Sequence, residues 1–179
     1  MFLRLLFIIL IIFTSSCSEK EEKISIIKEK EINLQMIDAY KEGVEAFENG
    51  DALFAAKKFN EAEILFPQSI WAPKSALMAA YAYYSQDYYA DAIYELERFI
   101  KVYAKDNRIP YARFLLAMCY YEEIVDEKKD LGPLLKAQDQ FKFIIKTYPD
   151  SDFALDAKFK LNLINDILAS KEIYLGRYY

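Results

Sequence analysis

GVEAFENGDALFAAKKFNEAEILFPQSIWAP, residues 43–73, is the stretch that decides the fold. Two segments with apolar residues at helical spacing are separated by Asn49-Gly50-Asp51, a sequence that favours a turn. Small residues lie where two helices would cross closely, with one aromatic ring beside them: Gly43, Ala55, Ala62 and Phe59. The stretch therefore predicts a pair of antiparallel helices.

The pattern of this pair recurs 37 residues further along the chain, where Gly43 is followed by Ala80 and then by Ala117. The second helix repeats as well, the third time after about eight additional residues: Ala55, Phe59 and Ala62 return as Ala92, Leu96 and Phe99, and then as Ala137, Phe141 and Ile144. Because helical solenoids use units of ~34 residues, this period predicts an all-α solenoid of antiparallel helix pairs with about seven helices.

The segment that connects two pairs also recurs. FPQSIWA at residues 66–72 is echoed by YPDSDFA at residues 148–154. Proline cannot continue a helix and pushes the preceding residue out of the α region, so each segment predicts a helix boundary. The predicted units cover residues 33–69, 70–106 and 107–151, with part of a fourth in residues 152–179.

With these residues the chain resembles the tetratricopeptide repeat (TPR) and, more closely, the BamD family of outer-membrane assembly lipoproteins. Further segments carry the closer resemblance: Asp87-Tyr88-Tyr89-Ala90-Asp91-Ala92, Glu97-Arg98-Phe99-Ile100 and residues 172–179. The resemblance implies a right-handed TPR-like solenoid over residues 33–179. In that family the chain continues beyond the final Tyr-Tyr pair for about two more repeats, so we expect a shortened member.

The resemblance also implies a function. Members are lipid-anchored scaffolds of the β-barrel assembly machinery (BAM), dock on its barrel subunit BamA, and engage aromatic-ended targeting segments of incoming barrels. We therefore expect BamA, other BAM subunits and unfolded outer-membrane β-barrel clients as partners, with no enzymatic activity and no cofactor. Two alternatives stay open: another periplasmic TPR adaptor for cell-envelope or division complexes, and an accessory domain of an enzyme.

The N-terminus has the features of an export signal. Arg4 precedes an apolar run, residues 5–13, which is too short for a membrane-spanning helix of ~20 residues and predicts a cleaved signal peptide over residues 1–16. The small residues before Cys17 resemble the bacterial lipobox, in which such a cysteine is acylated. Residues 17–32 would then form a lipidated tether, and Ser18 implies the outer membrane, at its periplasmic face. The alternative is an ordinary signal peptide, with Cys17 incidental.

Composition narrows the chemistry that the chain can perform. It carries 23 Lys and Arg against 28 Asp and Glu, and this acidic balance without a basic block argues against nucleic-acid binding. It contains no histidine, the commonest general base and metal ligand. Besides Cys17 there is one cysteine, Cys119, in an apolar run that predicts a buried side chain. We expect no catalytic residue and no metal site.

Aromatic residues are abundant, with 15 Tyr and 13 Phe. In TPR-like solenoids the first helix of each pair lines a peptide-binding groove, and that register selects one set of side chains here: Tyr40, Phe47, Leu77, Tyr81, Tyr84, Tyr111, Phe114, Met118 and Tyr121. Lys74 and Arg113 would lie at the groove edge and meet a carboxylate. Because rings offer a large contact area, an extended peptide with aromatic side chains is the expected ligand. The alternative is that the rings only fill the core.

Overall fold

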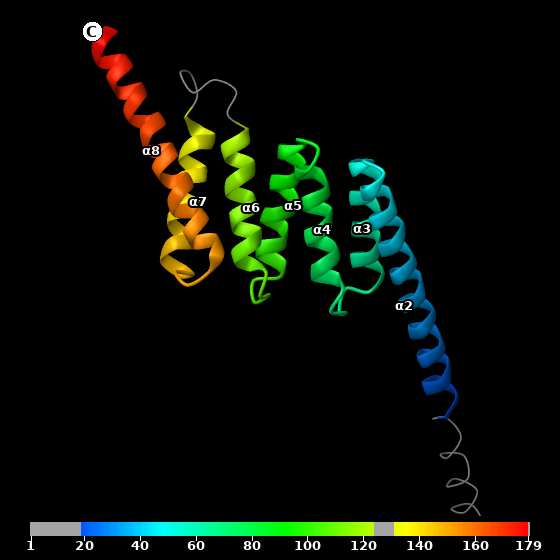
Figure 1. Ribbon diagram of the computed structural model, residues 1–179. Coiled ribbons are helices and arrows are strands. Elements are labelled where there is room, and N and C mark those ends of the chain that lie inside the picture. Colours follow the sequence, from blue (N-terminus) through cyan, green and yellow to red (C-terminus); the bar gives the residue numbers. More distant parts are fainter. Residues whose placement is uncertain (1–18, 124–130, 179) are drawn as a thin grey trace, which may run out of the picture.

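The computed structural model describes residues 19–123 and 131–178, and every regular element in these ranges is an α-helix. In chain order the helices are α2 (Glu19–Glu48), α3 (Ala52–Leu65), α4 (Ala72–Tyr84), α5 (Tyr89–Val102), α6 (Ile109–Glu122), α7 (Gly132–Thr147) and α8 (Asp152–Tyr178) (Figure 1). The prediction of an all-α fold with about seven helices is confirmed. The predicted signal peptide, Cys17 and residues 124–130 of the inserted segment lie outside the described residues.

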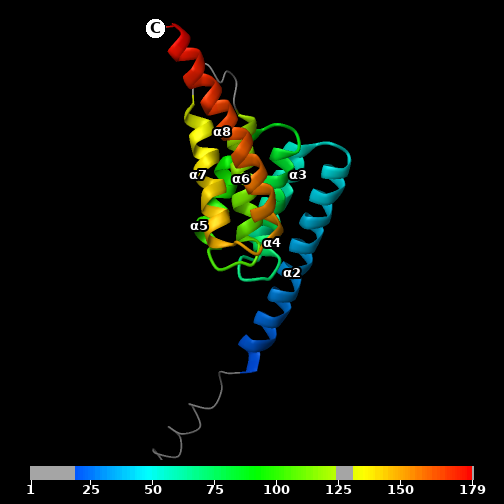
Figure 2. The same ribbon diagram turned by 60° about the vertical axis from the view of Figure 1, so that its left-hand side comes forward.

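The helices form two layers. Each helix packs against the next one along the chain, and α4 and α8 also contact α6. Together α2, α4, α6 and α8 make up one layer, called the front layer below, while α3, α5 and α7 make up the back layer (Figure 1 and Figure 2). Successive pairs therefore stack side by side, which is the arrangement of a helical solenoid.

The first helix is longer than the sequence analysis predicts. It begins at Glu19, not near residue 33, and its N-terminal part projects beyond the rest of the stack (Figure 1). Residues 19–32, interpreted above as part of a tether, thus continue the helix. Residues 19–42 contain neither Gly nor Pro and are rich in Glu and Lys, which are good helix formers. Nothing in this sequence ends the helix before it reaches the body of the protein.

The turn within a pair keeps its backbone conformation although its sequence changes. Gly50 has a φ of 80°, and Asp87, 37 residues later, has a φ of 63°. Both lie in the left-handed region, which glycine adopts freely and aspartate more readily than most residues. After the first of these turns, Asp51 caps α3 by accepting a hydrogen bond of 3.0 Å from the backbone N–H of Phe54. The period found in the sequence is therefore also a period of the backbone.

The two echoed connecting segments perform the same structural task. The hydroxyl of Ser69 accepts a hydrogen bond of 3.1 Å from the backbone N–H of Ala72, at the start of α4. The hydroxyl of Ser151 accepts one of 3.2 Å from the backbone N–H of Ala154, in the first turn of α8. Each serine satisfies an N–H that has no partner within its helix. Both predicted helix boundaries are confirmed.

Small residues set the distance between the helices. A Cβ atom at Gly43 would lie 2.8 Å from Cδ1 of Phe59, so α2 and α3 approach too closely there for a side chain unless the ring moves. Ala80 and Ala117, at the equivalent positions of α4 and α6, are fully buried. Cys119 is also fully buried, as predicted, and burial raises the pKa of its thiol to about 12.

Candidate functional site

A hollow of about 310 Å³ opens on the front layer between α4, α6 and α8. We call it the aromatic hollow. Its lining comes from three helices: Tyr81 and Tyr84 on α4, Tyr111, Phe114, Leu115 and Met118 on α6, and Asp156, Phe159 and Lys160 on α8. An apolar recess of this size with a few polar groups is typical of a ligand-binding site.

Helical spacing brings the rings of the hollow together. Tyr81 and Tyr84 are three residues apart on α4, and their ring centroids lie 6.4 Å from each other. On α6, Tyr111 and Phe114 have the same spacing, and both rings contact Phe153 at the start of α8, at 5.6 and 5.7 Å. Phe114 also contacts the fully buried Phe141 of α7 at 5.8 Å, so the core holds the floor of the hollow in place.

The hollow is apolar but carries opposite charges at its α8 side. The ammonium of Lys160 lies 4.7 Å from the ring centroid of Tyr121, a cation–π contact, and Asp156 lines the same wall. Burial raises the pKa of Tyr111 to about 12 and also raises the pKa of Tyr84. Both hydroxyls are therefore neutral at physiological pH and available as hydrogen-bond donors.

The structure brings five of the nine predicted groove residues into the aromatic hollow: Tyr81, Tyr84, Tyr111, Phe114 and Met118. Tyr121 lies beside it through its contact with Lys160, and Phe47 extends it toward α2, with its ring 5.7 Å from that of Tyr81. Tyr40 lies outside the hollow, packed between Phe59 and Trp71 at 5.3 Å from each. The ammonium of Lys74 lies over the rings of Tyr40 and Trp71, 5.2 Å and 4.6 Å from their centroids.

Two of the predicted site residues do not face the groove. Leu77 is only 7% exposed and belongs to the main core cluster. Its side chain is shorter than the rings at the equivalent positions, Tyr40 and Phe114, and does not reach the surface of the groove. Arg113 points to the back layer: its guanidinium lies 4.1 Å from the ring centroid of Phe143 and donates a hydrogen bond to Gln140, both on α7. Neither residue is available to a ligand in the hollow.

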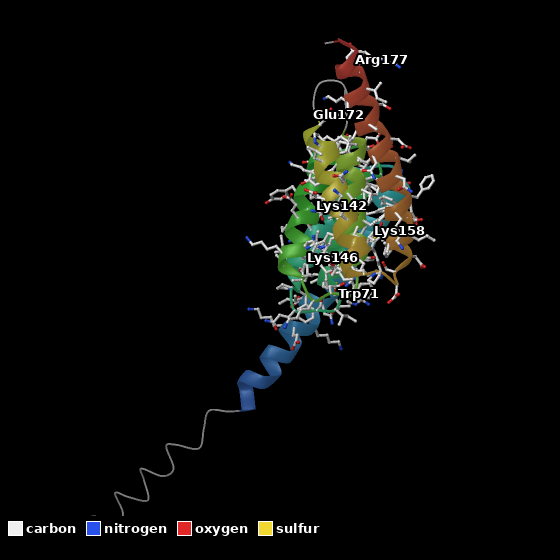
Figure 3. All side chains as sticks on the ribbon, turned by 90° about the vertical axis from the view of Figure 1, so that its left-hand side faces the viewer. Trp71, Lys142, Lys146, Lys158, Glu172 and Arg177 are labelled. Atoms are coloured by element: carbon white, nitrogen blue, oxygen red, sulfur yellow. The ribbon has the colours of Figure 1, made fainter. Side chains whose placement is uncertain are left out.

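The sequence analysis missed the contribution of α8. Asp156 and Phe159 follow Tyr111 and Phe114 by 45 residues, which is the repeat period once the inserted residues are counted. The groove register therefore extends to this helix, and that signal could have found both residues. Phe159 is 65% exposed at the outer rim of the hollow. Lys142 and Lys146 on α7 and Lys158 on α8 are exposed on the face that these two helices present at the C-terminal end of the stack (Figure 3).

Stacked helical pairs with a recess on their front layer define a TPR-like repeat protein. A solved structure supports this class: the first TPR domain of the human RPAP3 protein superposes with a TM-score of 0.56 at 18% identity, covering 78% of this chain and 97% of that one. At this identity the similarity shows the fold alone. Among the described residues, no helix has both the length and the apolar character needed to cross a membrane.

The chain belongs to the YfiO family of outer membrane lipoproteins, whose family model matches residues 33–179. It is 34% identical over 166 residues to the outer membrane protein assembly factor BamD of Caulobacter vibrioides, covering 92% of this chain and 53% of that protein. It is 31% identical over 140 residues to BamD of Rickettsia prowazekii, covering 78% and 56%. The chain thus spans about half the length of these relatives.

Proposed function

We propose that this chain is a lipid-anchored scaffold of the β-barrel assembly machinery and takes part in the folding and insertion of β-barrel proteins into the outer membrane. The proposal is supported by membership of an outer membrane lipoprotein family and by similarity to proteins named as assembly factors rather than as enzymes. Its partners would be BamA, other BAM subunits and unfolded β-barrel clients. A TPR-like stack suits this role because its exposed helix faces offer extended binding surfaces.

The aromatic hollow would hold the client. One observation carries this part of the proposal: five residues selected by the groove register line one recess together with Phe159. Rings from three helices can surround an aromatic side chain of an extended peptide, and the neutral hydroxyls of Tyr84 and Tyr111 can donate to its backbone carbonyls. Lys160 would supply the cation for a terminal carboxylate, in place of Lys74 and Arg113.

Peptide binding tests this assignment. The probe is a fluorescent peptide that ends in Phe with a free carboxylate, measured by anisotropy against the double variant Tyr81→Ala, Phe159→Ala. We expect affinity to fall by about tenfold or more, because a buried aromatic contact contributes upward of ~1 kcal/mol. The matched control is Tyr94→Ala, an exposed tyrosine on α5 in the back layer. If both variants bind like the unmodified protein, the hollow is not the client site.

Membrane attachment is a separate part of the proposal. Cys17 would carry the acyl chains, and more than one chain is needed for stable anchoring. Cys17→Ser should move the protein from the membrane fraction to the soluble fraction while leaving peptide affinity unchanged. A protein that stays with the membrane after this substitution, or that carries no acyl chain by mass spectrometry, would contradict lipidation at Cys17.

A further inference from the structure

A second recess lies on the opposite side of the stack, between α3 and α5 of the back layer. We call it the back cleft. It has a volume of about 350 Å³, and its lining differs completely from that of the aromatic hollow: Asn60, Glu63, Ile64, Pro67, Tyr94, Glu95 and Arg98. No function described so far uses these residues.

The floor of the back cleft is a network of charged groups centred on Arg98. Its guanidinium donates two hydrogen bonds to Glu63, at 2.8 and 2.6 Å, and its Nε donates one of 2.9 Å to Glu95. The hydroxyl of Tyr103 donates a further bond of 2.6 Å to Glu63, and the amide of Asn60 donates one of 3.0 Å to Glu95. Every polar group of Arg98 is thus directed at a carboxylate of the protein itself.

Negative charges outnumber positive charges in this network. Two carboxylates, with side chains only 8% and 10% exposed, face a single guanidinium. Within the described residues, Oδ1 of Asn60 is buried and accepts no hydrogen bond. Each carboxylate also has room for further donors, because its two oxygens can together accept about four hydrogen bonds. The floor therefore carries more negative than positive charge.

The rim of the back cleft is apolar and exposed. Ile64 is 75% exposed and Tyr94 is 68% exposed, and Pro67 lies beside them. Such a rim fits the aliphatic stem of a long side chain whose charged end reaches a polar floor. An aromatic ring at the entrance adds a cation–π contribution when the guest is cationic.

The network is not a general device of the repeat. If it only joined neighbouring helices of the back layer, the next gap, between α5 and α7, should contain its counterpart. The residues one unit further along the chain cannot form it: Glu97, Ile100, Gln140 and Phe143 stand at the positions of Asn60, Glu63, Glu95 and Arg98. The back cleft is thus specific to one place in the stack.

We propose that the back cleft is a docking site for a partner protein and takes a lysine or arginine side chain from it. The basic group would donate to the carboxylate of Glu95, and its stem would lie against Ile64 and Tyr94. Charge complementarity selects this occupant, because the cleft holds one more negative group than positive. An acidic guest is disfavoured, since Arg98 is already bonded to both carboxylates. The proposal is independent of the client site on the front layer.

A peptide selection tests the proposal with the full chain. A displayed library of random peptides is panned on the protein, with the variant Ile64→Ala, Tyr94→Ala as the counter-target that removes ligands of all other surfaces. Both side chains are largely exposed, so this variant should fold normally. We expect the remaining peptides to share a Lys or Arg next to aliphatic residues.

Two measurements on a synthesised hit then decide the outcome. Replacing its basic residue by norleucine should weaken binding at least tenfold, and so should the double variant of the protein. Leu53→Ala, which removes an exposed leucine of α3 that does not line the cleft, should leave binding unchanged. The proposal is overturned if no peptide survives the counter-selection, if the hits lack basic residues, or if norleucine binds equally well.

Discussion

The aromatic hollow and the back cleft are two gaps in one repeating stack, and different forces shape them. The hollow is lined by rings that rest on one another and on the core through Phe114. The back cleft is closed at its floor by short directional bonds from Arg98 to Glu63 and Glu95. The repeat fixes where a gap occurs, while the side chains at each position decide what the gap can bind.

This difference separates stability from binding in the two places. The half-buried rings of the hollow lose little stabilising energy when a ligand leaves, because their contacts with each other remain. A buried charge that loses its partner keeps its full desolvation cost. Substitutions in the hollow should therefore affect mainly ligand affinity, whereas substitutions in the network of the back cleft should affect mainly folding.

The largest expected effect is that of Arg98→Met, which leaves two buried carboxylates without their cation. We expect a loss of about 3 kcal/mol in the free energy of unfolding at pH 7, measured by urea denaturation. The matched control is Arg113→Met on α6, because Arg113 meets a neutral ring and an amide and leaves no buried carboxylate behind. Equal losses in the two variants would mean that the uncompensated carboxylates do not account for the loss.

Phe114→Ala is the next largest change and divides the hollow into floor and rim. Phe114 contacts Phe141 and Phe153, so its removal should cost about 2 kcal/mol of unfolding free energy, less than a fully buried Phe. Phe159→Ala at the exposed rim should cost less than about 0.5 kcal/mol. Both variants should weaken binding of the Phe-terminated peptide. A rim substitution as costly as the floor substitution would show that the hollow is a closed core.

Parts of this arrangement follow from the sequence and others do not. Gly43, Ala80 and Ala117 predict the stacking because close approach requires small residues at a fixed period. The same period selects Tyr81, Tyr111 and other hollow residues, and it reaches Phe159 once the insertion is counted. Periodicity works here because it states which face of a helix a position occupies.

The sequence analysis misplaced Arg113 and missed the network of the back cleft, and both errors have physical causes. Arg113 is adjacent to Phe114, but one residue turns the helix by about 100°, enough to point its side chain to α7 instead of the groove. The network of the back cleft joins Glu63 to Arg98, 35 residues away, and nothing local distinguishes these charges from those of a solvated helix face. Pairing between units depends on side-chain rotamers, which a repeat period does not specify.

Tyr103→Phe tests the hydrogen-bond network at its edge. The hydroxyl of Tyr103 donates a 2.6 Å bond to the buried Glu63, and removing it should cost about 1–2 kcal/mol at pH 7, since the acceptor is charged. Arg98 still satisfies Glu63, so the effect stays below that of Arg98→Met. Thermal or urea unfolding measures the difference, and an unchanged midpoint would mean that the bond contributes nothing to stability.

The smallest expected effect is that of Tyr111→Phe, the counterpart in the hollow. Within the described residues, the hydroxyl of Tyr111 makes no hydrogen bond, so stability at pH 7 should change by less than about 0.5 kcal/mol. Above pH 10 the two proteins should diverge. Burial raises the pKa of Tyr111 to about 12, so the unfolded chain loses this proton first, and the tyrosine's contribution disappears as pH rises from about 10 to about 12.

The Tyr111→Phe variant lacks this group. Between about pH 10 and about pH 12 its free energy of unfolding should therefore fall by about 1 kcal/mol less than that of the unmodified protein, a figure that allows for the partial exposure of Tyr111 to solvent. Urea unfolding at pH 9, 10.5 and 11.5 measures the slope, and absorbance at 295 nm counts the tyrosines that ionise late. Tyr103→Phe should also reduce the fall in stability above about pH 10, because burial and the bond to Glu63 raise the pKa of Tyr103 too. At pH 7, however, only Tyr103→Phe should be less stable than the unmodified protein. If Tyr111→Phe is equally costly there, its hydroxyl is bonded inside the protein and cannot be offered to a ligand in the hollow.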